Sequence, residues 1–281
     1  MANRGKRESS PTSAALTEAA QSGDRQQQRF TSIIAALQER GSVTVEEMAE
    51  RLAVTVVTIR RDLDVLEQQG LLRRTHGGAV SIEPLFYEPF KKDRTFLAQV
   101  ERLAQEKRRI GRAAAALIEP GETIAITPGT TTLEVIRGLP LNSNITVVTN
   151  TANIAMELSK RKDVKVFVTG GRLQGDWFSL VGPTAVRSLE NILIHTMFVG
   201  ADGIDARWGV SCFDSEEAEL NAAMARQARR HIAVADHTKL GAVANFRICE
   251  IGIVQRLITD LGAADEMIAP LQKLGIEVMR V

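Results

Sequence analysis

The apolar segment at residues 123–127 is followed by the string Pro128-Gly129-Thr130-Thr131 and then by a helical pattern. A turn from a strand into a helix leaves the first N–H groups of the helix without partners inside the helix. Those groups, the positive end of the helix dipole and the threonine hydroxyls together suit a phosphate. We therefore expect a phosphorylated small molecule at this loop, which the protein either transforms or senses.

Similar apolar segments recur along the second half of the chain. They read as strands, with helical patterns between most of them, and they lie at residues 123–127, 145–149, 164–169, 196–201, 231–235, 256–259 and 276–281. Alternation of this kind predicts an α/β domain, over residues 107–281, with a largely parallel sheet covered by helices.

Polar residues stand directly after these expected strands. In open α/β sheets, ligands bind outside the carboxyl ends of the strands. One such loop would mean little, because glycine and threonine are ordinary turn residues. Their repetition at one edge predicts a polar pocket with phosphate-binding parts. Its candidate residues are Gly129, Thr130, Thr131, Asn150, Gly170, Gly171, Arg172, Asp202, Asp236, His237, Lys239 and Asp260.

Composition limits the classes of function. The chain has 281 residues and a formal net charge of +1, so any surface for nucleic acid must be a local patch. Cys212 and Cys249 lack the spacing of a zinc site, and we expect neither a metal nor a cofactor. Residues 1–26 read as a disordered tail without a secretory signal. No run approaches the roughly 18 apolar residues of a membrane span, so we expect a soluble, cytoplasmic protein.

Residues 27–80 have the pattern of a helix-turn-helix. Apolar residues from Phe30 to Leu37 recur at helical spacing and indicate a first helix. Thr44 stands where it would cap a short second helix. Thr55 stands where it would cap a third helix that ends near Gly70.

The outer face of this third helix carries groups suited to DNA. Thr58, Arg60 and Arg61 lie there, opposite an apolar stripe. Arginine can bridge guanine or clasp a phosphate, and threonine can contact the DNA backbone or a thymine methyl. The alternative is a solvated charged face, since three acids of the same helix nearly cancel the arginines: Asp62, Asp64 and Glu67.

A basic hairpin is expected after the third helix. Arg73, Arg74 and His76 lie in a short strand that turns at Gly77-Gly78, as a wing beside a recognition helix would. Such a wing reaches the backbone or the minor groove. Residues 81–106 then read as a linker to the second domain.

The strings Thr58-Ile59-Arg60-Arg61-Asp62-Leu63, Gly70-Leu71-Leu72 and "RTHGGA" resemble the winged helix of the DeoR family of bacterial transcription regulators. The resemblance implies a winged helix-turn-helix that binds double-stranded operator DNA. The positions for DNA contact that it implies are Thr44, Thr55, Thr58, Arg60, Arg61, Arg73, Arg74 and His76.

The strings "PGTTTLEV", "FVTGGRL", "FVGADGID", "EEAELNAAM" and "VADHTKLG" extend the resemblance to the sensor domain of that family, which is similar in fold to ribose-5-phosphate isomerase. The family's sensor domain binds a phosphorylated sugar or related metabolite. The resemblance implies that Gly129, Thr130 and Thr131 hold the phosphate, that Asp202 faces the sugar hydroxyls, and that the pocket is lined by Asn150, Gly170, Gly171 and Lys239. Two positions depart from the family pattern. Thr127 replaces a frequent acid, which makes it a candidate determinant of effector identity, and Asn221 replaces a frequent lysine.

An isomerase of sugar phosphates is the alternative. That chemistry needs a base and a group that polarises the carbonyl. Asp202 and Asp205 resemble an acidic motif of the isomerases, but the lysine and glycine-rich string that should follow is absent from "ARWGVSCFDSEEAEL". We therefore expect a homo-oligomeric regulator that represses carbohydrate genes and responds to a phosphorylated sugar, and not an enzyme.

Overall fold

The computed structural model describes residues 13–69, 71–81, 94–175 and 178–281. The chain divides into two compact units, Met1–Ile82 and Glu83–Val281. Each unit is described by itself.

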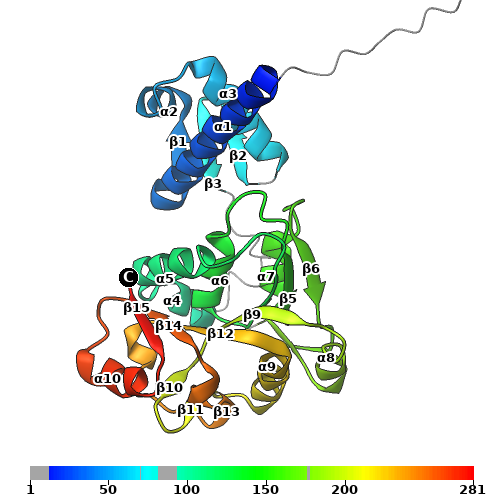
Figure 1. Cartoon of the computed structure of the whole chain (residues 1–281), viewed down its shortest axis with the longest axis vertical. Helices are drawn as coiled ribbons and strands as arrows, with labels where there is room; N and C mark the ends of the chain where they lie inside the picture. Colours follow the sequence, from blue (N-terminus) through cyan, green and yellow to red (C-terminus); the bar gives the residue numbers. More distant parts are fainter. Residues whose placement is uncertain (1–12, 70, 82–93, 176–177) are drawn as a thin grey trace, which may run out of the picture. The chain divides into compact units, whose positions relative to one another are not determined.

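The first unit is a helix-turn-helix with a small sheet (Figure 1). Its elements are α1 (Ser13–Arg40), β1 (Ser42–Thr44), α2 (Val45–Arg51), α3 (Val56–Gln68), β2 (Leu72–Thr75) and β3 (Gly78–Ser81). The three strands are antiparallel in the order β1-β3-β2. Apolar residues from every helix and from β2 fill the core, among them Ile33, Met48, Ile59, Leu63 and Leu72. This unit confirms the winged helix-turn-helix that the sequence predicts.

Two segments differ from the expected boundaries. Helix α1 begins at Ser13, so residues 13–26 are helical where we expected a disordered tail. The segment contains four alanines and two glutamines, which favour helix. The rest of that tail, residues 1–12, lies outside the described residues, as do residues 82–93 of the expected linker. The end of that linker is helical as well, in α4 (Arg94–Glu101), and α5 (Ala104–Ala115) begins within it.

A seven-stranded sheet forms the centre of the second unit. Its order is β15-β14-β12-β9-β4-β5-β6, and every neighbouring pair is parallel. The strands are β4 (Thr123–Ile126), β5 (Thr146–Thr149), β6 (Lys165–Val168), β9 (Ile194–Val199), β12 (Ala228–Val234), β14 (Arg256–Thr259) and β15 (Glu277–Arg280). All seven lie in or overlap segments predicted as strands, which confirms the parallel α/β class; β9 and β12 begin two and three residues before their predicted segments.

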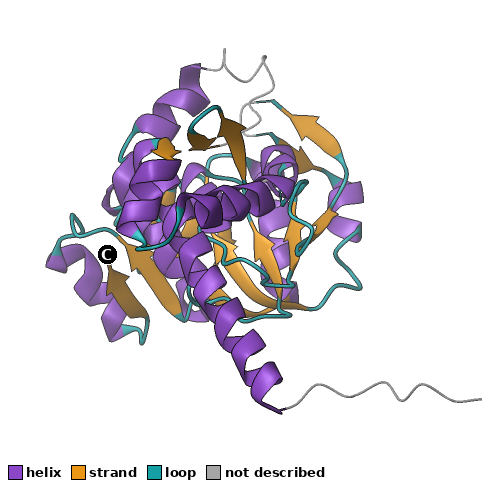
Figure 2. Cartoon of the chain, turned by 90° about the horizontal axis from the view of Figure 1, so that it is seen from above, coloured by secondary structure: helices purple, strands orange, loops and turns teal. Residues whose placement is uncertain are grey.

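Helices cover both faces of this sheet (Figure 2). They are α4, α5, α6 (Thr130–Arg137), α7 (Ala152–Leu158), α8 (Pro183–Arg187), α9 (Ser215–Gln227) and α10 (Asp265–Lys273). Side chains alternate along each strand, so Ile126 and Phe198 pack in one core with α5, α6 and α7. Ala125 and Val199 pack in the other core with α8, α9 and α10.

Short antiparallel strands and two 3₁₀ helices complete the unit, and the sequence analysis did not predict them. They are the hairpin of β7 (Arg172–Gln174) and β8 (Ser179–Val181), the sheet of β10 (Gly203–Asp205), β11 (Gly209–Cys212) and β13 (Phe246–Cys249), and two 3₁₀ helices, His237–Lys239 and Ile251–Ile253. Each strand has only three or four residues, which is too short for a clear period-two pattern.

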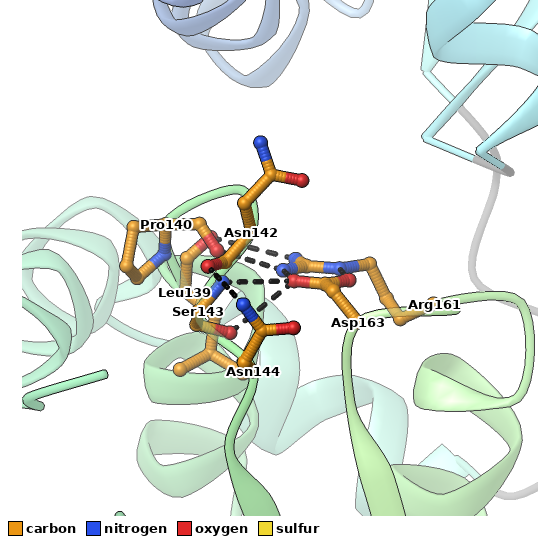
Figure 3. Close-up of polar contacts among 7 residues, drawn as sticks. All are labelled: Leu139, Pro140, Asn142, Ser143, Asn144, Arg161 and Asp163. Atoms are coloured by element: carbon orange, nitrogen blue, oxygen red, sulfur yellow. Dashed lines mark hydrogen bonds and ion pairs between the residues drawn. The ribbon is translucent and has the colours of Figure 1, made fainter. Parts of the chain in front are cut away.

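An ion pair anchors the loop between α6 and β5. Arg161 contacts Asp163 at 2.6 Å and donates to the carbonyl of Pro140 at 2.7 Å, while the Ser143 N–H donates to Asp163 at 3.1 Å (Figure 3). Burial alone would raise the pKa of Asp163. The hydrogen bond and charge of Arg161 outweigh burial, so the pKa is lowered. The folded state therefore favours the ionised carboxylate.

Asp163→Asn should lower the free energy of unfolding at pH 7 by about 1–2 kcal/mol, because it weakens the charge-assisted bonds. A lowered pKa gives stability that is present above the pKa of the unfolded chain, about 3.9, and lost as pH falls further. The difference in the free energy of unfolding between variant and wild type, measured by urea titration, should therefore shrink at acidic pH. Asp265→Asn is the control, because its pair with Arg280 is exposed. A gap that is constant with pH would contradict the prediction.

Candidate functional site

Threonine caps begin both helices of the helix-turn-helix. The Thr44 hydroxyl accepts a hydrogen bond from Glu47 N at 3.2 Å, and the Thr55 hydroxyl accepts one from Thr58 N at 3.2 Å. The Thr55 and Thr58 hydroxyls also lie 2.9 Å apart. Both caps confirm the predicted helix starts. Their side chains stay exposed at the start of each helix.

Helix α3 turns its arginines outward and one of its acids inward. Arg60 and Arg61 are exposed, whereas Asp62 is only 1% exposed. Arg29 of α1 donates to both oxygens of Asp62, at 2.5 and 3.0 Å, and this hydrogen bond raises the pKa of Arg29. Asp62 therefore does not offset the arginines of the outer face, contrary to the alternative drawn from the sequence.

The other two acids of α3 are bound to the wing. Arg74 lies 3.4 Å from Asp64, donates from its guanidinium to the carbonyl of Arg60 at 3.2 Å, and donates its backbone N–H to Glu67 at 2.8 Å. Arg74 was predicted as a DNA contact, but here its side chain ties β2 to α3. Arg73 and His76, also predicted from the sequence, are exposed on the wing.

The sequence analysis omitted Val57 from the candidate DNA contacts. Its side chain is 56% exposed in the first turn of α3. An apolar side chain there suits the methyl group of thymine. The signal for a DNA contact is that Val57 is exposed while Ile59, Leu63 and Leu66 of the same helix are buried. The extent of this exposure is known only from the structure.

The predicted effector residues follow strands that are adjacent in the sheet. From the centre of the sheet, β4, β5 and β6 follow one another toward one edge. Strands β9, β12, β14 and β15 follow one another toward the other edge. Strands β4 and β9 are therefore the switch point, where the loops diverge and ligands bind in such folds. Gly129, Thr130 and Thr131 follow β4, Asp202 follows β9, and Lys239 follows β12.

The loop after β4 forms the start of α6. Gly129 is the N-cap residue with φ of 145°, a conformation that favours glycine. The Thr132 hydroxyl donates to the Gly129 carbonyl at 2.9 Å. Thr130 is partly exposed and Thr131 is 8% exposed. Backbone N–H groups and two threonine side chains thus gather at the first turn of a helix, as phosphate binding requires.

Thr127 has a different position from the one expected. Its side chain is fully buried, and its hydroxyl accepts a hydrogen bond from Gly200 N at 2.9 Å. This bond holds the loop after β4 against the loop after β9. Thr127 therefore acts here by positioning the loops, and direct contact with an effector stays a prediction.

Charged residues meet at the neighbouring loops. Lys239 Nζ lies 3.6 Å from Asp202 Oδ1, and the Phe213 N–H donates to Asp202 Oδ2 at 3.2 Å. Lys107 of α5 is buried, and burial lowers its pKa; the charge of Asp236 opposes this effect and that of Lys239 adds to it. The sequence analysis did not single out Lys107, because nothing in its local pattern sets it apart from the basic residues around it.

A buried carboxylate fixes the loop that carries Lys239. Asp260 accepts from His237 N at 2.7 Å and from Gly262 N at 2.8 Å, and lies 2.8 Å from His237 Nδ1. Burial would raise the pKa of Asp260, but these hydrogen bonds outweigh it and lower the pKa. The ionised Asp260 therefore holds the first residue of the His237–Lys239 helix.

The remaining predicted residues lie beside β5 and β6. Asn150 is fully buried, and its amide is 3.5 Å from the Leu180 carbonyl. Gly170 and Gly171 follow β6, and a Cβ on Gly171, whose φ is 107°, would lie 2.6 Å from the Val181 carbonyl oxygen. Gly171 thus permits close packing of the chain. Arg172 is 62% exposed and pairs with Glu216 at the start of α9.

Family models match both units of the chain. Residues 29–84 match the DeoR-like helix-turn-helix domain, and residues 102–261 match the DeoR C terminal sensor domain. The chain belongs to the DeoR family. It is therefore a DNA-binding transcriptional regulator, and the match favours a DeoR regulator over the isomerase alternative.

Relatives of known name agree with this family. The glycerol-3-phosphate regulon repressor of Escherichia coli K12 is 32% identical over 84% of this chain and 91% of its own. The HTH-type transcriptional regulator GolR of Listeria innocua is 30% identical over 89% of this chain and 97% of its own. Among solved structures, ribose 5 phosphate isomerase A from Neisseria gonorrhoeae is 15% identical, with a TM-score of 0.34, over 50% of this DeoR-family chain and 54% of its own.

The described residues offer neither a membrane-spanning helix nor a metal-binding cluster. None of their helices is both long enough and apolar enough to cross a membrane. Nor do they contain a group of three or more His, Cys, Asp or Glu side chains that could hold a metal ion.

Proposed function

We propose that this chain represses carbohydrate genes as a homo-oligomer and that a phosphorylated sugar, bound at the switch point of the sensor sheet, changes its affinity for operator DNA. The observation that carries the proposal is the first turn of α6, with Gly129, Thr130 and Thr131. The Thr127–Gly200 hydrogen bond ties this turn to the loop after β9, whose Asp202 pairs with Lys239. Relatives named as repressors, one of them of the glycerol-3-phosphate regulon, support the same class of effector.

The phosphate is assigned to the N–H groups and hydroxyls of Thr130 and Thr131. Lys239 supplies a positive charge beside them, and Asp202 both holds that lysine and offers acceptors to sugar hydroxyls. Asn150, Gly170 and Gly171 line the side of the pocket nearest β5 and β6. Arg172 belongs to the rim, since its side chain pairs with Glu216.

The outer face of α3 is assigned to the major groove. Thr58, Arg60 and Arg61 contact base edges or phosphates, Thr44 and Thr55 lie at helix starts that face the backbone, and Arg73 and His76 reach it from the wing. One domain of this size offers few contacts, so paired half-sites bound by two subunits give useful affinity. An effector changes this affinity only if it binds the DNA-competent and incompetent states unequally.

A thermal-shift screen of the full chain against a panel of sugar phosphates tests the effector. A ligand of the folded state raises the melting temperature by mass action, and the best ligand should also change the affinity for a DNA fragment selected from random sequence. The best ligand should leave the assay chemically unchanged. Turnover of that ligand would instead support the isomerase alternative.

Thr130→Val combined with Thr131→Val should weaken binding of the best sugar phosphate at least about tenfold, because two hydroxyl donors to a charged phosphate are lost. Affinity for DNA without the effector should stay at the wild-type value. Titration calorimetry measures the first and fluorescence anisotropy the second. Thr146→Val, at the start of β5 and so at the end of the strands opposite the candidate site, is the matched control. Wild-type effector binding by the double variant would remove the phosphate assignment.

A further inference from the structure

Buried polar side chains gather where β5, β8 and α9 meet. Asn150, Thr151, Ser179 and Asn221 are each no more than 1% exposed. A side-chain oxygen of each of the four has no hydrogen-bond partner: Asn150 Oδ1, Thr151 Oγ1, Ser179 Oγ and Asn221 Oδ1. Buried polar atoms without a partner are uncommon, and a bound group is one reason to keep them.

These residues lie next to one another in the fold. Leu180 N donates to the Asn150 carbonyl at 2.7 Å, and Thr151 pairs with Ser179 in a β-bridge. Ser179 and Asn221 both approach the carboxyl group of Glu217, and each favours its ionised form. The contact from Ser179 Oγ does not reach the geometry of a hydrogen bond. The four residues and Glu217 are called the α9 cluster below.

The surroundings of Glu217 are negative. Burial first, and then the charges of Asp202 and Asp214, raise its pKa to about 7. Asp214 caps α9 by accepting from Glu217 N at 2.9 Å. Arg172, at the start of β7, pairs with Glu216 and so does not offset these negative charges. A phosphate is therefore disfavoured here, whereas an uncharged hydroxyl is not.

We propose that the α9 cluster is the hydroxyl-binding half of the effector site, where neutral Glu217 donates a hydrogen bond to a sugar hydroxyl and the unpartnered oxygens accept from others. The inference rests on the proposed sugar-phosphate effector. Asp202 joins the two halves, since it pairs with Lys239 and also acts on Glu217. The effector class is then a phosphate ester whose far end is an uncharged polyol.

The proposal makes effector recognition sensitive to pH. Ionised Glu217 cannot donate and would place a third negative charge beside Asp202 and Asp214. The Cys212 thiol of β11 also faces Glu217, and its pKa is raised to about 12 by burial first and by Glu217 next. Cys212 therefore stays neutral over the physiological range, and Glu217 governs the change.

The test measures the affinity of the full chain for the best sugar phosphate of the screen, by calorimetry at pH 6.0 and 8.5. Between pH 6.0 and 8.5, the affinity of the wild type should fall roughly tenfold more than that of Glu217→Gln, whose amide donates a hydrogen bond at both pH values. The phosphate itself titrates near pH 6, and comparison of the two proteins at each pH removes that contribution. Glu216→Gln is the control and should follow the wild type.

A second variant and a second probe separate the two halves of the site. Asn221→Leu should weaken the sugar phosphate severalfold but leave binding of inorganic phosphate unchanged, because only the polyol reaches the α9 cluster. Circular dichroism confirms that each variant is folded. Equal pH dependence in wild type and Glu217→Gln would overturn the inference while the effector proposal stands. Failure of every sugar phosphate to bind the wild type would overturn both.

Discussion

Arg61→Ala is expected to weaken binding of the full chain to a selected DNA fragment about 5- to 150-fold, since an arginine contact with a base or phosphate is worth about 1–3 kcal/mol. Arg61 is exposed on the outer face of α3, and no ion pair within the described part of the chain involves it. The acids of that helix are bound elsewhere, Asp62 to Arg29 and Asp64 to Arg74. The positive charge is therefore available to DNA.

Fluorescence anisotropy at several salt concentrations checks this expectation. If Arg61 contacts a phosphate, its loss should also reduce the slope of log affinity against log salt by about one. Arg280→Ala, in the second unit, is the control and should bind as the wild type does. The melting temperature should not change. Wild-type affinity in Arg61→Ala would mean that the recognition face has been misassigned.

Arg29→Met is expected to destabilise the first unit by about 2–3 kcal/mol, less than the cost of breaking a fully buried pair, because the Arg29 side chain is 19% exposed. Asp62 is 1% exposed and receives two hydrogen bonds from Arg29. The pair joins α1 to α3, so its loss should also loosen the recognition helix. Urea unfolding measures the change, and operator binding should weaken in proportion to the unfolded fraction.

Two further variants separate charge from packing. Arg40→Met removes the cation of an exposed pair with Glu47 and should cost less than about 1 kcal/mol. Arg29→Met with Asp62→Leu removes both buried charges and should recover much of the stability that the single variant loses. A single variant as stable as the wild type would show that the buried pair contributes little.

The parallel sheet could be predicted because its strands are long apolar segments separated by helices. Ile126, Phe198 and their neighbours alternate between two cores, and such segments persist over four to seven residues. The hairpin of β7 and β8 has only three residues in each strand, so its pairing depends on contacts far along the chain. The start of α1 was missed because charges and small residues near the N-terminus suggested a tail.

The sequence predicts which loops form the candidate site, but not which hydrogen bonds and ion pairs its residues make. Parallel strands bring their carboxyl ends to one edge, so Gly129, Asp202 and Lys239 could be grouped in advance. The hydrogen-bond and ion-pair partners of Thr127, Asp62 and Arg74 lie elsewhere in the sequence, and no local pattern predicts them. The same holds in part for Glu217, whose raised pKa depends on burial and on Asp202, which only the fold brings close, as well as on Asp214, three residues before it.

The hydrogen bond from Gly200 N to Thr127 spans the switch point between β4 and β9. It connects the halves of the sheet that run in opposite directions from this point, directly beneath the start of α6. In the proposed effector site this bond would hold the loop in place before a ligand arrives, so little conformational entropy would be lost on binding of a phosphate. If the phosphate loop is fixed in both states of the regulator, the proposed contacts of the polyol, more than those of the phosphate, would distinguish the states and set the strength of the response.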